Sequence, residues 1–364
     1  PMARPTQALI DRQALRDNFA IAQAVSKARC MPMVKANAYG HGAEIVCRAL
    51  ENAPAFGVAS IEEALELRRL GVDKPILLLE GTFSADEITV AEEHQLWLMV
   101  ENHQQCRELL EAPLQRPISL WLGLDTGMHR LGFQADEINA IYQSLATSGK
   151  VQSCVVLASH LASADHCDDP KTRRQIANFD AAYASIAVPD GARLQQSLAN
   201  SAALLGWPKT RRDWQRPGYM LYGNSPFVHG NDDYGLRPVM TFVTAVTSLR
   251  SIDAGESVGY AGTWTASRAS RIATLAVGYG DGYPRHAPNG TPVLINGRRC
   301  PLIGRVSMDM LTVDITDCPT VNIGDQSTLW GPDLPVNEIA EHCATNGYQL
   351  LSGITARVPR IAQN

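Results

Sequence analysis

The feature of this sequence that most constrains its fold is an alternation of short apolar runs and amphipathic segments from residue 30 to about residue 223. Segments such as 61–71 repeat apolar residues at i, i+3 and i+4, so they predict helices. Strands that alternate with helices in this way are typical of parallel pairing. The predicted strands are 31–34, 55–60, 75–80, 96–100, 118–124, 153–160, 194–200 and 216–222.

These eight strand–helix units predict an α/β fold that begins with a closed (β/α)8 TIM-type barrel. The alternative is a doubly wound open sheet, but no G-x-G-x-x-G sequence follows the first strand. After about residue 236, β-branched runs at 239–249, 271–277, 291–296 and 309–315 alternate with turns rich in Gly, Asp and Pro. This pattern predicts a mainly antiparallel β domain with one helix near 336–346.

The length of 364 residues exceeds the usual size of a single core, which agrees with two domains. We expect the barrel over 1–236, with its first few residues free to pair with the β domain, and the β domain over 237–364.

Composition excludes several classes of protein. A net charge of −5 gives no basic surface for nucleic acid or anionic lipid, and no apolar run is long enough to span a membrane. The eight cysteines are scattered without a C-x-x-C pair, and the first residues contain no apolar signal core. We therefore expect reduced thiols and a cytoplasmic location.

Chemistry in such barrels belongs at the C-terminal ends of the strands. Lys35 follows an apolar run, where lost hydration lowers the pKa of an amine and frees the neutral form that attacks aldehydes. A lysine whose chain lies along the strand end and whose amine reaches solvent fits the same position.

Other strand ends carry further polar residues. Arg130 lies in a glycine-rich loop and could clamp a carboxylate or a phenolate, although a plain surface arginine fits as well. His160 is followed by Asp165, His166 and Asp168, but the spacing does not match a metal site, so we expect no metal.

The ends of the last two predicted strands suit an anion. Asn200 and Ser201 join a strand to a helix, with Ser201 suited to cap that helix, and backbone N–H groups there can bind phosphate. Gly218 lets a ligand approach the backbone closely. A cap without a ligand is the simpler alternative.

Taken in order along the chain, a set of motifs resembles the alanine racemases, fold-type III enzymes that use pyridoxal phosphate. The motifs are VKANAYGHG, LDTGMHRLGF, SHLASAD, NSA, RPGYMLYG, VGYAGTW, GYGDGYPR, GRVSMDM and RVPR. The resemblance implies an isomerase that interconverts L- and D-alanine, for peptidoglycan synthesis or for alanine catabolism. It also implies a homodimer with shared active sites.

The matching motifs assign roles to individual residues. Lys35 carries pyridoxal phosphate as a Schiff base and is the base on the D-face, whereas Tyr260, from the partner subunit, is the base on the L-face. The residues that contact the cofactor are Lys35, Tyr39, Arg130, His160, Asn200, Ser201, Arg216, Gly218 and Tyr219. Arg130, Met308 and Asp309 contact the substrate, and Asp165, Tyr279, Arg285, Arg305 and Ile354 form its entrance.

The resemblance gives Arg216 a selective role, because it faces the pyridine nitrogen of the cofactor. An arginine cannot accept a hydrogen bond, so this nitrogen stays unprotonated and withdraws electrons weakly. Proton exchange then proceeds while transamination is suppressed. Arg216 also starts a hydrogen-bond chain that runs through His160 to Tyr260.

Two positions depart from the family pattern. Gly123 replaces a lysine that many members carbamylate to orient the arginine equivalent to Arg130, and our hypothesis is that a bound anion or water takes its place. Ala356 replaces a tyrosine at the substrate gate, so another side chain fills the gap or the gate is wider and admits amino acids larger than alanine. The alternative functions are a barrel-type amino-acid decarboxylase and a non-catalytic protein that binds pyridoxal phosphate.

Overall fold

The apolar runs of the first half pair as eight parallel strands in the order β2-β9-β8-β7-β6-β5-β4-β3. The computed structural model describes residues 3–227 and 234–364. The strands are β2 (Arg29–Cys30), β3 (Phe56–Val58), β4 (Ile76–Leu78), β5 (Leu96–Val100), β6 (Ile118–Gly123), β7 (Val151–Ala158), β8 (Arg193–Ser197) and β9 (Trp214–Gln215). Strands β2 and β3 stand at the two ends of this order. A parallel bridge between Met33, just after β2, and Gly57 of β3 joins them, and the Val34 N–H donates to the Gly57 carbonyl (2.9 Å). The predicted barrel is confirmed.

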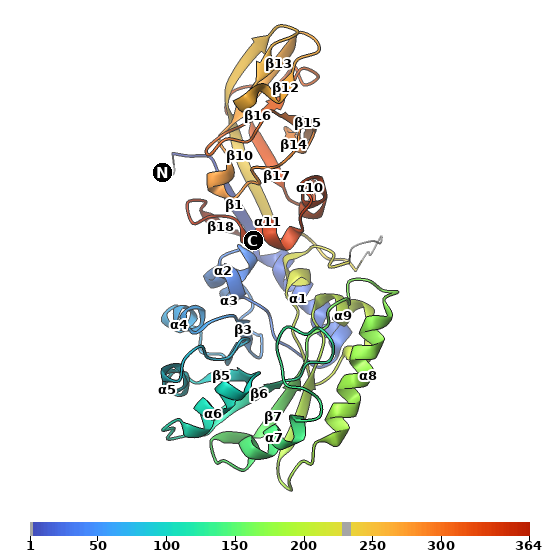
Figure 1. The fold of residues 1–364 in the computed structure, drawn as a ribbon. Coiled ribbons are helices and arrows are strands. Elements are labelled where there is room, and N and C mark those ends of the chain that lie inside the picture. The colour runs from blue at the N-terminus through green and yellow to red at the C-terminus, as the bar shows by residue number, and fades with distance from the viewer. Residues whose placement is uncertain (1–2, 228–233) are drawn as a thin grey trace.

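Helices cover the outside of the barrel (Figure 1). The longer ones have caps that can be read from the sequence: Asp11 accepts from the Ala14 N–H and Ser60 from the Glu63 N–H. The helices are α1 (Arg12–Ser26), α3 (Ala43–Ala49), α4 (Ile61–Arg69), α5 (Asp86–Glu93), α6 (His103–Glu111), α7 (Ile138–Ala146), α8 (Pro170–Ser185) and α9 (Ser201–Gly206).

Large side chains fill the interior of the barrel. Met31, Met33 and Met99 pack there with Trp121 and Trp214, all of them buried. The Trp121 and Trp214 rings lie 5.8 Å apart between centroids. Because these side chains fill the interior of the barrel, the free space lies at the C-terminal ends of its strands.

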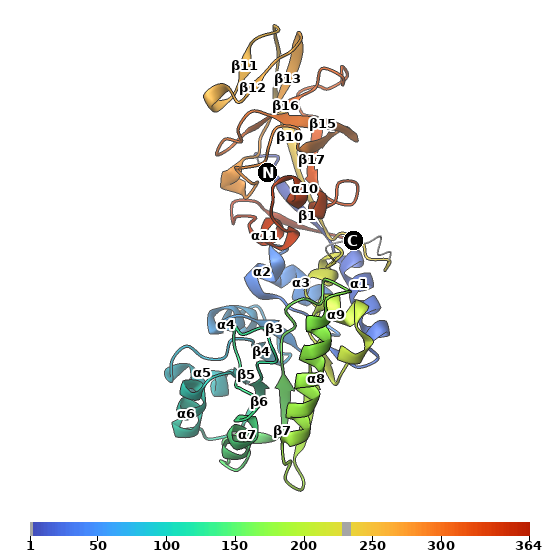
Figure 2. The same cartoon turned by 45° about the vertical axis from the view of Figure 1, so that its right-hand side comes forward.

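The second half forms an eight-stranded sheet in the order β13-β16-β15-β14-β17-β10-β1-β18, with an extra pairing of β10 to β13. Strand β1, at the start of the chain, pairs with β10 antiparallel and with β18 parallel. The strands are β1 (Gln7–Asp11), β10 (Met240–Ile252), β13 (Ser270–Leu275), β14 (Pro292–Ile295), β15 (Arg298–Ile303), β16 (Leu311–Asp314), β17 (Gln326–Trp330) and β18 (Arg360–Gln363), and a separate hairpin holds β11 (Ser257–Val258) and β12 (Trp264–Thr265). The mainly antiparallel β domain is therefore confirmed, and Figure 2 shows it stacked on the barrel end to end.

Three predicted elements are wrong. The strand predicted at 31–34 follows β2 and contains only the bridge at Met33. The range 216–222 contains no strand: β9 ends at Gln215 and a 3₁₀ helix, η2 (Tyr219–Tyr222), follows, because Pro217 donates no hydrogen bond and Gly218 starts a turn. The helix predicted near 336–346 is instead two helices, α10 (Val336–His342) and α11 (Gly347–Ser352). Asn346 separates them because its side chain caps the second helix through the Gln349 N–H (2.9 Å).

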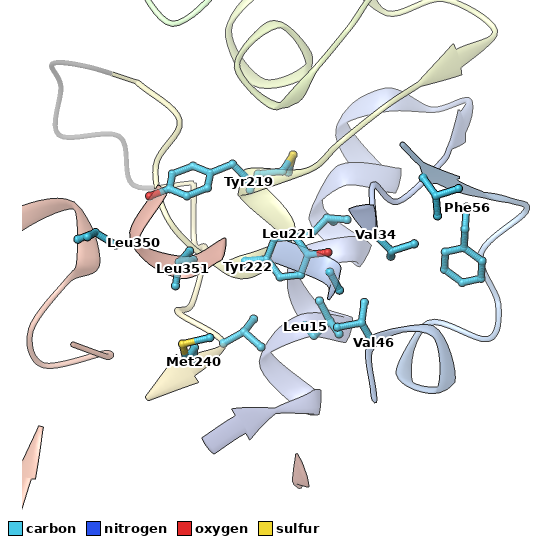
Figure 3. Close-up of a cluster of buried hydrophobic side chains, with 14 of the residues drawn as sticks. Leu15, Val34, Val46, Phe56, Tyr219, Leu221, Tyr222, Met240, Leu350 and Leu351 are labelled. Atoms are coloured by element: carbon cyan, nitrogen blue, oxygen red, sulfur yellow. The ribbon is translucent and has the colours of Figure 1, made fainter. Parts of the chain in front are cut away.

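Helix α11 joins the two domains. Leu350 and Leu351 on α11 lie in one buried cluster with Leu221 and Tyr222 of η2 and with Met240 of β10 (Figure 3). No helix within the described ranges is long and apolar enough to cross a membrane. The domain boundary near residue 236 stays a prediction, and it follows the undescribed residues 228–233.

Gly40 is where α11 approaches the barrel most closely. It has a left-handed φ of +82°, and a Cβ there would overlap the Leu351 carbonyl oxygen. Gly71 has nearly the same φ, +85°, but nothing lies within 4 Å of its Cβ position. A comparison of substitutions at Gly40 and Gly71 therefore separates the cost of backbone strain from the cost of steric overlap.

We expect Gly71→Ala to lower the free energy of unfolding by about 1–2 kcal/mol, the cost of a left-handed alanine. Gly40→Ala should lose about 1–3 kcal/mol more, because α11 must move off the barrel. Urea denaturation at one protein concentration measures both. Equal losses would show that the contact between Gly40 and Leu351 contributes nothing.

Candidate active site

A cavity of about 1170 Å³ opens at the C-terminal ends of the barrel strands. Many of the residues predicted for the site line it, although they come from distant parts of the sequence. They are Lys35, Tyr39, Arg130, His160, Asp165, Asn200, Ser201, Arg216, Gly218 and Tyr219. The strand-end rule therefore selects residues that do come together in space.

Lys35 begins an unusual left-handed turn, α2 (Lys35–Tyr39), rather than ending a strand. The four residues from Ala36 to Tyr39 have φ angles between +51° and +54°. Such a conformation costs about 1–2 kcal/mol for each residue that is not glycine. Backbone strain of this kind is concentrated at functional sites, where the surrounding structure holds it in place.

Glu63 of α4 holds the start of the turn, and the sequence analysis missed it. One carboxylate oxygen accepts from the Ala36 N–H (2.7 Å) and the other from the Ala59 N–H (2.7 Å). Farther along, the Asn37 side chain accepts from the Ala43 N–H (2.9 Å). These bonds fix the backbone on both sides of the turn, so the position of Lys35 is set by its neighbours.

The Lys35 amine is half-buried in the cavity. Burial, together with the positive charges of Arg130 and Arg216, lowers its pKa, while Glu80 and Glu63 act in the opposite direction. The balance favours the neutral amine, which is the nucleophilic form.

Ser201, Gly218 and Tyr39 form a small polar cradle. The Ser201 hydroxyl accepts from the N–H groups of Gly218 (3.0 Å) and Met220 (3.1 Å). A Cβ at Gly218 would overlap the Tyr39 hydroxyl, so only glycine lets this hydroxyl reach the backbone. Ser201 is not the helix cap that we predicted, because Asn200 caps α9 by accepting from the Ala203 N–H (3.1 Å).

Aromatic rings line the side of the cavity next to the β domain. Tyr219 stacks on Tyr348 of α11, with centroids 3.9 Å apart, and Tyr39 stacks on Tyr222 at 4.9 Å. Tyr348 also lines the cavity and was missed in the sequence. The signal was weak, because Tyr348 lies just beyond the helix predicted near 336–346 and belongs to none of the motifs.

Arg216 is buried, with 6% of its surface exposed. Its guanidinium donates to the Ser197 hydroxyl and to the Ser159 carbonyl (2.6 Å). Burial lowers its pKa to about 10, so it stays protonated at neutral pH. Among the described residues no hydrogen bond joins Arg216 to His160, so the predicted chain through His160 is not formed.

His160 faces the open cavity. Desolvation lowers its pKa to about 3, and the charges of Arg216, Arg130 and Lys35 act in the same direction. Because the three cations favour the neutral imidazole whether or not water fills the cavity, we expect a neutral ring.

Other predicted residues lie outside the cavity. Tyr260, Tyr279 and Met308 are 72%, 37% and 54% exposed, and Ile354 is buried in the β domain. Asp309, Arg285 and Arg305 are also exposed on the β domain. The Gly280 N–H donates to the Met308 carbonyl (2.8 Å), so the loops that carry Tyr279 and Met308 lie together. None of these residues lines the cavity that contains Lys35.

The Glu101 side chain packs against Gly123. A Cβ at Gly123 would lie 2.8 Å from the Cγ atom of Glu101, although both residues also line the cavity. Our hypothesis of a bound anion or water beside Arg130 stays a prediction. Glu101 directly follows strand β5, so the strand-end rule could have selected it.

Ala356 is exposed and does not line the cavity, so the nature of the gate stays a prediction. Within the described ranges, no group of three or more His, Cys, Asp or Glu side chains could hold a metal ion.

Two family models match most of the chain. The model "Alanine racemase, N-terminal domain" matches residues 10–226 and "Alanine racemase, C-terminal domain" matches residues 239–362. An alanine racemase from Xanthomonas axonopodis pv. citri is 48% identical over 360 residues, which are 98% of this chain and 96% of that protein.

Solved structures agree with these matches. The biosynthetic alanine racemase from Pseudomonas aeruginosa has a TM-score of 0.93 and 45% identity, covering 99% of this chain and 100% of that one. An alanine racemase from Bartonella henselae, described with covalently bound pyridoxal phosphate, has a TM-score of 0.90 and 29% identity, covering 100% of both chains.

We expect the His160 imidazole to stay neutral from pH 8 down to pH 5, because its lowered pKa lies well below this range. Histidine-labelled NMR, with His160→Gln to assign the signal, measures this. A titration midpoint between pH 5 and 8 would mean that the neighbouring cations do not control the ring.

Proposed function

The chain belongs to the alanine racemase family, and we propose that it interconverts L- and D-alanine through two bases, Lys35 and Tyr260 of the partner subunit. The observation that carries the proposal is the half-buried Lys35 amine, whose pKa is lowered within a cavity that also holds Arg130 and Arg216. The exchange runs in both directions. One site can therefore serve D-alanine supply for peptidoglycan or alanine catabolism.

The described residues fit pyridoxal phosphate, the cofactor of this family. The cradle at Ser201, Gly218 and Tyr39 brings two hydroxyl groups and glycine backbone together at the cavity wall, where they could bind a phosphate, and a Cβ at Gly218 would displace the Tyr39 hydroxyl. Asn200, Tyr219 and His160 complete this part of the cavity. The aldehyde would meet the Lys35 amine.

When bound, pyridoxal phosphate withdraws electrons from the α-carbon of alanine and so makes its proton removable. Racemisation then needs one base on each face of that carbon. The Lys35 amine, whose pKa is lowered by burial and by the positive charges of Arg130 and Arg216, would take or return the proton on the D-face. Its position is fixed by the left-handed turn, which limits the directions that it can reach.

Tyr260 is proposed to act on the L-face of the neighbouring subunit's site. It is 72% exposed and lies outside the cavity of its own chain, so it is free to reach another. Met308 and Asp309 of the partner subunit would line the substrate pocket. Tyr279, Arg285, Arg305, Asp165 and Ile354 are proposed to form the entrance, and of these Asp165 lines the cavity of this chain.

A dimer follows from this arrangement. Three large side chains, Tyr260, Met308 and Met310, are exposed on the β domain. Exposed apolar surface of this kind marks interaction sites. In an isologous dimer the same surface serves both subunits, so each barrel receives a tyrosine from the other.

Arg216 supports racemisation over competing reactions. It is buried, it stays protonated, and it donates to Ser197 and Ser159, so it offers the cofactor no proton acceptor. Arg130 is proposed to contact the phenolic oxygen of the cofactor and the carboxylate of alanine.

The two alternative functions are less well supported. Both family models and the relatives are alanine racemases, not decarboxylases or binding proteins without activity. We also propose a cytoplasmic location, which is supported by eight free cysteines.

We expect the wild-type enzyme in D₂O to place deuterium in both enantiomers of alanine. Lys35→Ala should lose the Schiff-base absorbance and the activity. Tyr260→Phe should keep the absorbance but slow exchange roughly 10²–10⁴-fold, the usual contribution of one acid–base group.

Tyr183→Phe is a matched control. Tyr183 of α8 donates to the Leu194 carbonyl of β8, and neither residue lines the cavity. It should leave the exchange rate unchanged. Full rates in both directions for Tyr260→Phe would rule out the two-base assignment.

Mixing two inactive variants tests the shared site. In a dimer of one Lys35→Ala subunit and one Tyr260→Phe subunit, one of the two sites keeps both bases. Equal mixing should restore about a quarter of wild-type activity, because half of the dimers are mixed and each has one intact site. If activity does not return although mixed dimers form, each subunit must use its own tyrosine.

A further inference from the structure

The proposed reaction gives no role to Glu101, a buried acid in the cavity wall. Strands β5 and β6 lie side by side, and Val100 pairs with Leu122 (Figure 1). Glu101 therefore stands next to Gly123, at the same end of the sheet. Its side chain is 8% exposed and lines the cavity.

Glu101 and Gly123 are sterically complementary. A Cβ at Gly123 would lie 2.8 Å from the Glu101 Cγ and 3.4 Å from its Cδ. Gly123 does not have a left-handed φ, so its backbone does not itself require glycine. Glycine is needed at this position to leave room for the glutamate.

The carboxyl group of Glu101 has an unusual electrostatic environment. Its Oε2 atom is buried and has no hydrogen-bond partner among the described residues. Burial and the negative charge of Glu80 raise its pKa to about 7, whereas Arg130 and Arg216 favour the charged form. A buried unpaired oxygen is costly, so it points to a partner that completes the site.

Arg130 is the cation that lacks a fixed position. It is exposed at the cavity, and within the described ranges its guanidinium has no hydrogen bond or ion pair. Arg216, by contrast, is already held by Ser197 and Ser159. A free arginine must give up side-chain freedom before it can bind a carboxylate.

We propose that Glu101 is a positioning residue whose carboxylate holds the Arg130 guanidinium over the cavity, and that Gly123 provides the room that it needs. This inference rests on the proposed function, in which Arg130 meets the carboxylate of the substrate. In this inference, the negative charge that orients Arg130 comes from Glu101, which directly follows the neighbouring strand β5.

Removing the charge of Glu101 separates this role from a simple electrostatic one. By Coulomb's law alone, Glu101→Gln makes the cavity more positive and should strengthen the binding of an anion. If Glu101 positions Arg130, the same substitution should weaken the binding of an anion. Whether Glu101→Gln strengthens or weakens anion binding therefore decides between the two roles.

The probe is propionate, which has the carbon skeleton and carboxylate of alanine but no amine, so it binds without turnover. Calorimetry on the holoenzyme at pH 8.5 should give a dissociation constant about tenfold higher for Glu101→Gln, since charge-assisted hydrogen bonds are about twice as strong as neutral ones. Glu108→Gln is the matched control, because Glu108 also lines the cavity but accepts from Gln104 (2.9 Å). By Coulomb's law it should leave the dissociation constant unchanged or lower it slightly, but it should not raise it.

Two further variants test whether the effect passes through Arg130. In an Arg130→Ala background, Glu101→Gln should cause no additional loss of affinity. Gly123→Ala should weaken propionate binding like Glu101→Gln, since its methyl group displaces the glutamate without changing any charge. This second variant keeps the test informative if Glu101→Gln folds poorly.

The pH dependence gives an independent readout. The charged groups that face Glu101 are Glu80, Arg130 and Arg216. As pH falls through about 7, Glu101 takes up a proton, so wild-type affinity for propionate should fall, whereas that of Glu101→Gln should stay flat.

Tighter or unchanged binding by Glu101→Gln, or a full additional loss in the Arg130→Ala background, would overturn the inference. Failure of the two-base mechanism would be seen in the deuterium and mixing experiments instead. Propionate binding needs neither base, so the two failures are distinguishable.

Discussion

The left-handed turn from Ala36 to Tyr39 is the constraint on which the rest of the structure depends. Four residues without the freedom of glycine adopt positive φ, at a cost of about 1–2 kcal/mol each. The turn persists because Glu63 anchors its first N–H and because Tyr39 stacks on Tyr222. Its result is that Lys35 and Tyr39, the two ends of a five-residue turn, line one cavity.

The same cavity concentrates positive charge. Lys35, Arg130 and Arg216 line it together, and each cation disfavours protonation of its titratable neighbours. This environment favours a neutral amine at Lys35 and a neutral ring at His160. At Lys35 the acids Glu80 and Glu63 oppose this effect, so the charge state of the amine reflects a balance rather than a single residue.

The sequence predicts the barrel, the β domain and most of the cavity, because strand ends follow directly from the alternation of apolar and amphipathic segments. It does not predict elements that depend on tertiary contacts. Ser201 was read as a local cap, yet its hydroxyl binds Gly218 and Met220 far along the chain. Tyr348 becomes part of the site only when α11 docks on the barrel. Glu101, by contrast, directly follows β5, so the strand-end rule could have selected it. Contacts between residues that are far apart in the sequence leave no periodic signal in one sequence.

Strand β1 has a consequence for how the chain folds. It pairs with β10 on one side and with β18 on the other, matching Ala8 with Arg360. The barrel is thus inserted between the first strand of the β sheet and the rest of it. During synthesis the barrel can form early from mostly local units, but the sheet waits for the last residues of the chain. Closing it requires contacts of very high sequence separation, which are slow to form. The pairing of β1 with β18 is therefore among the last contacts that this sheet can make.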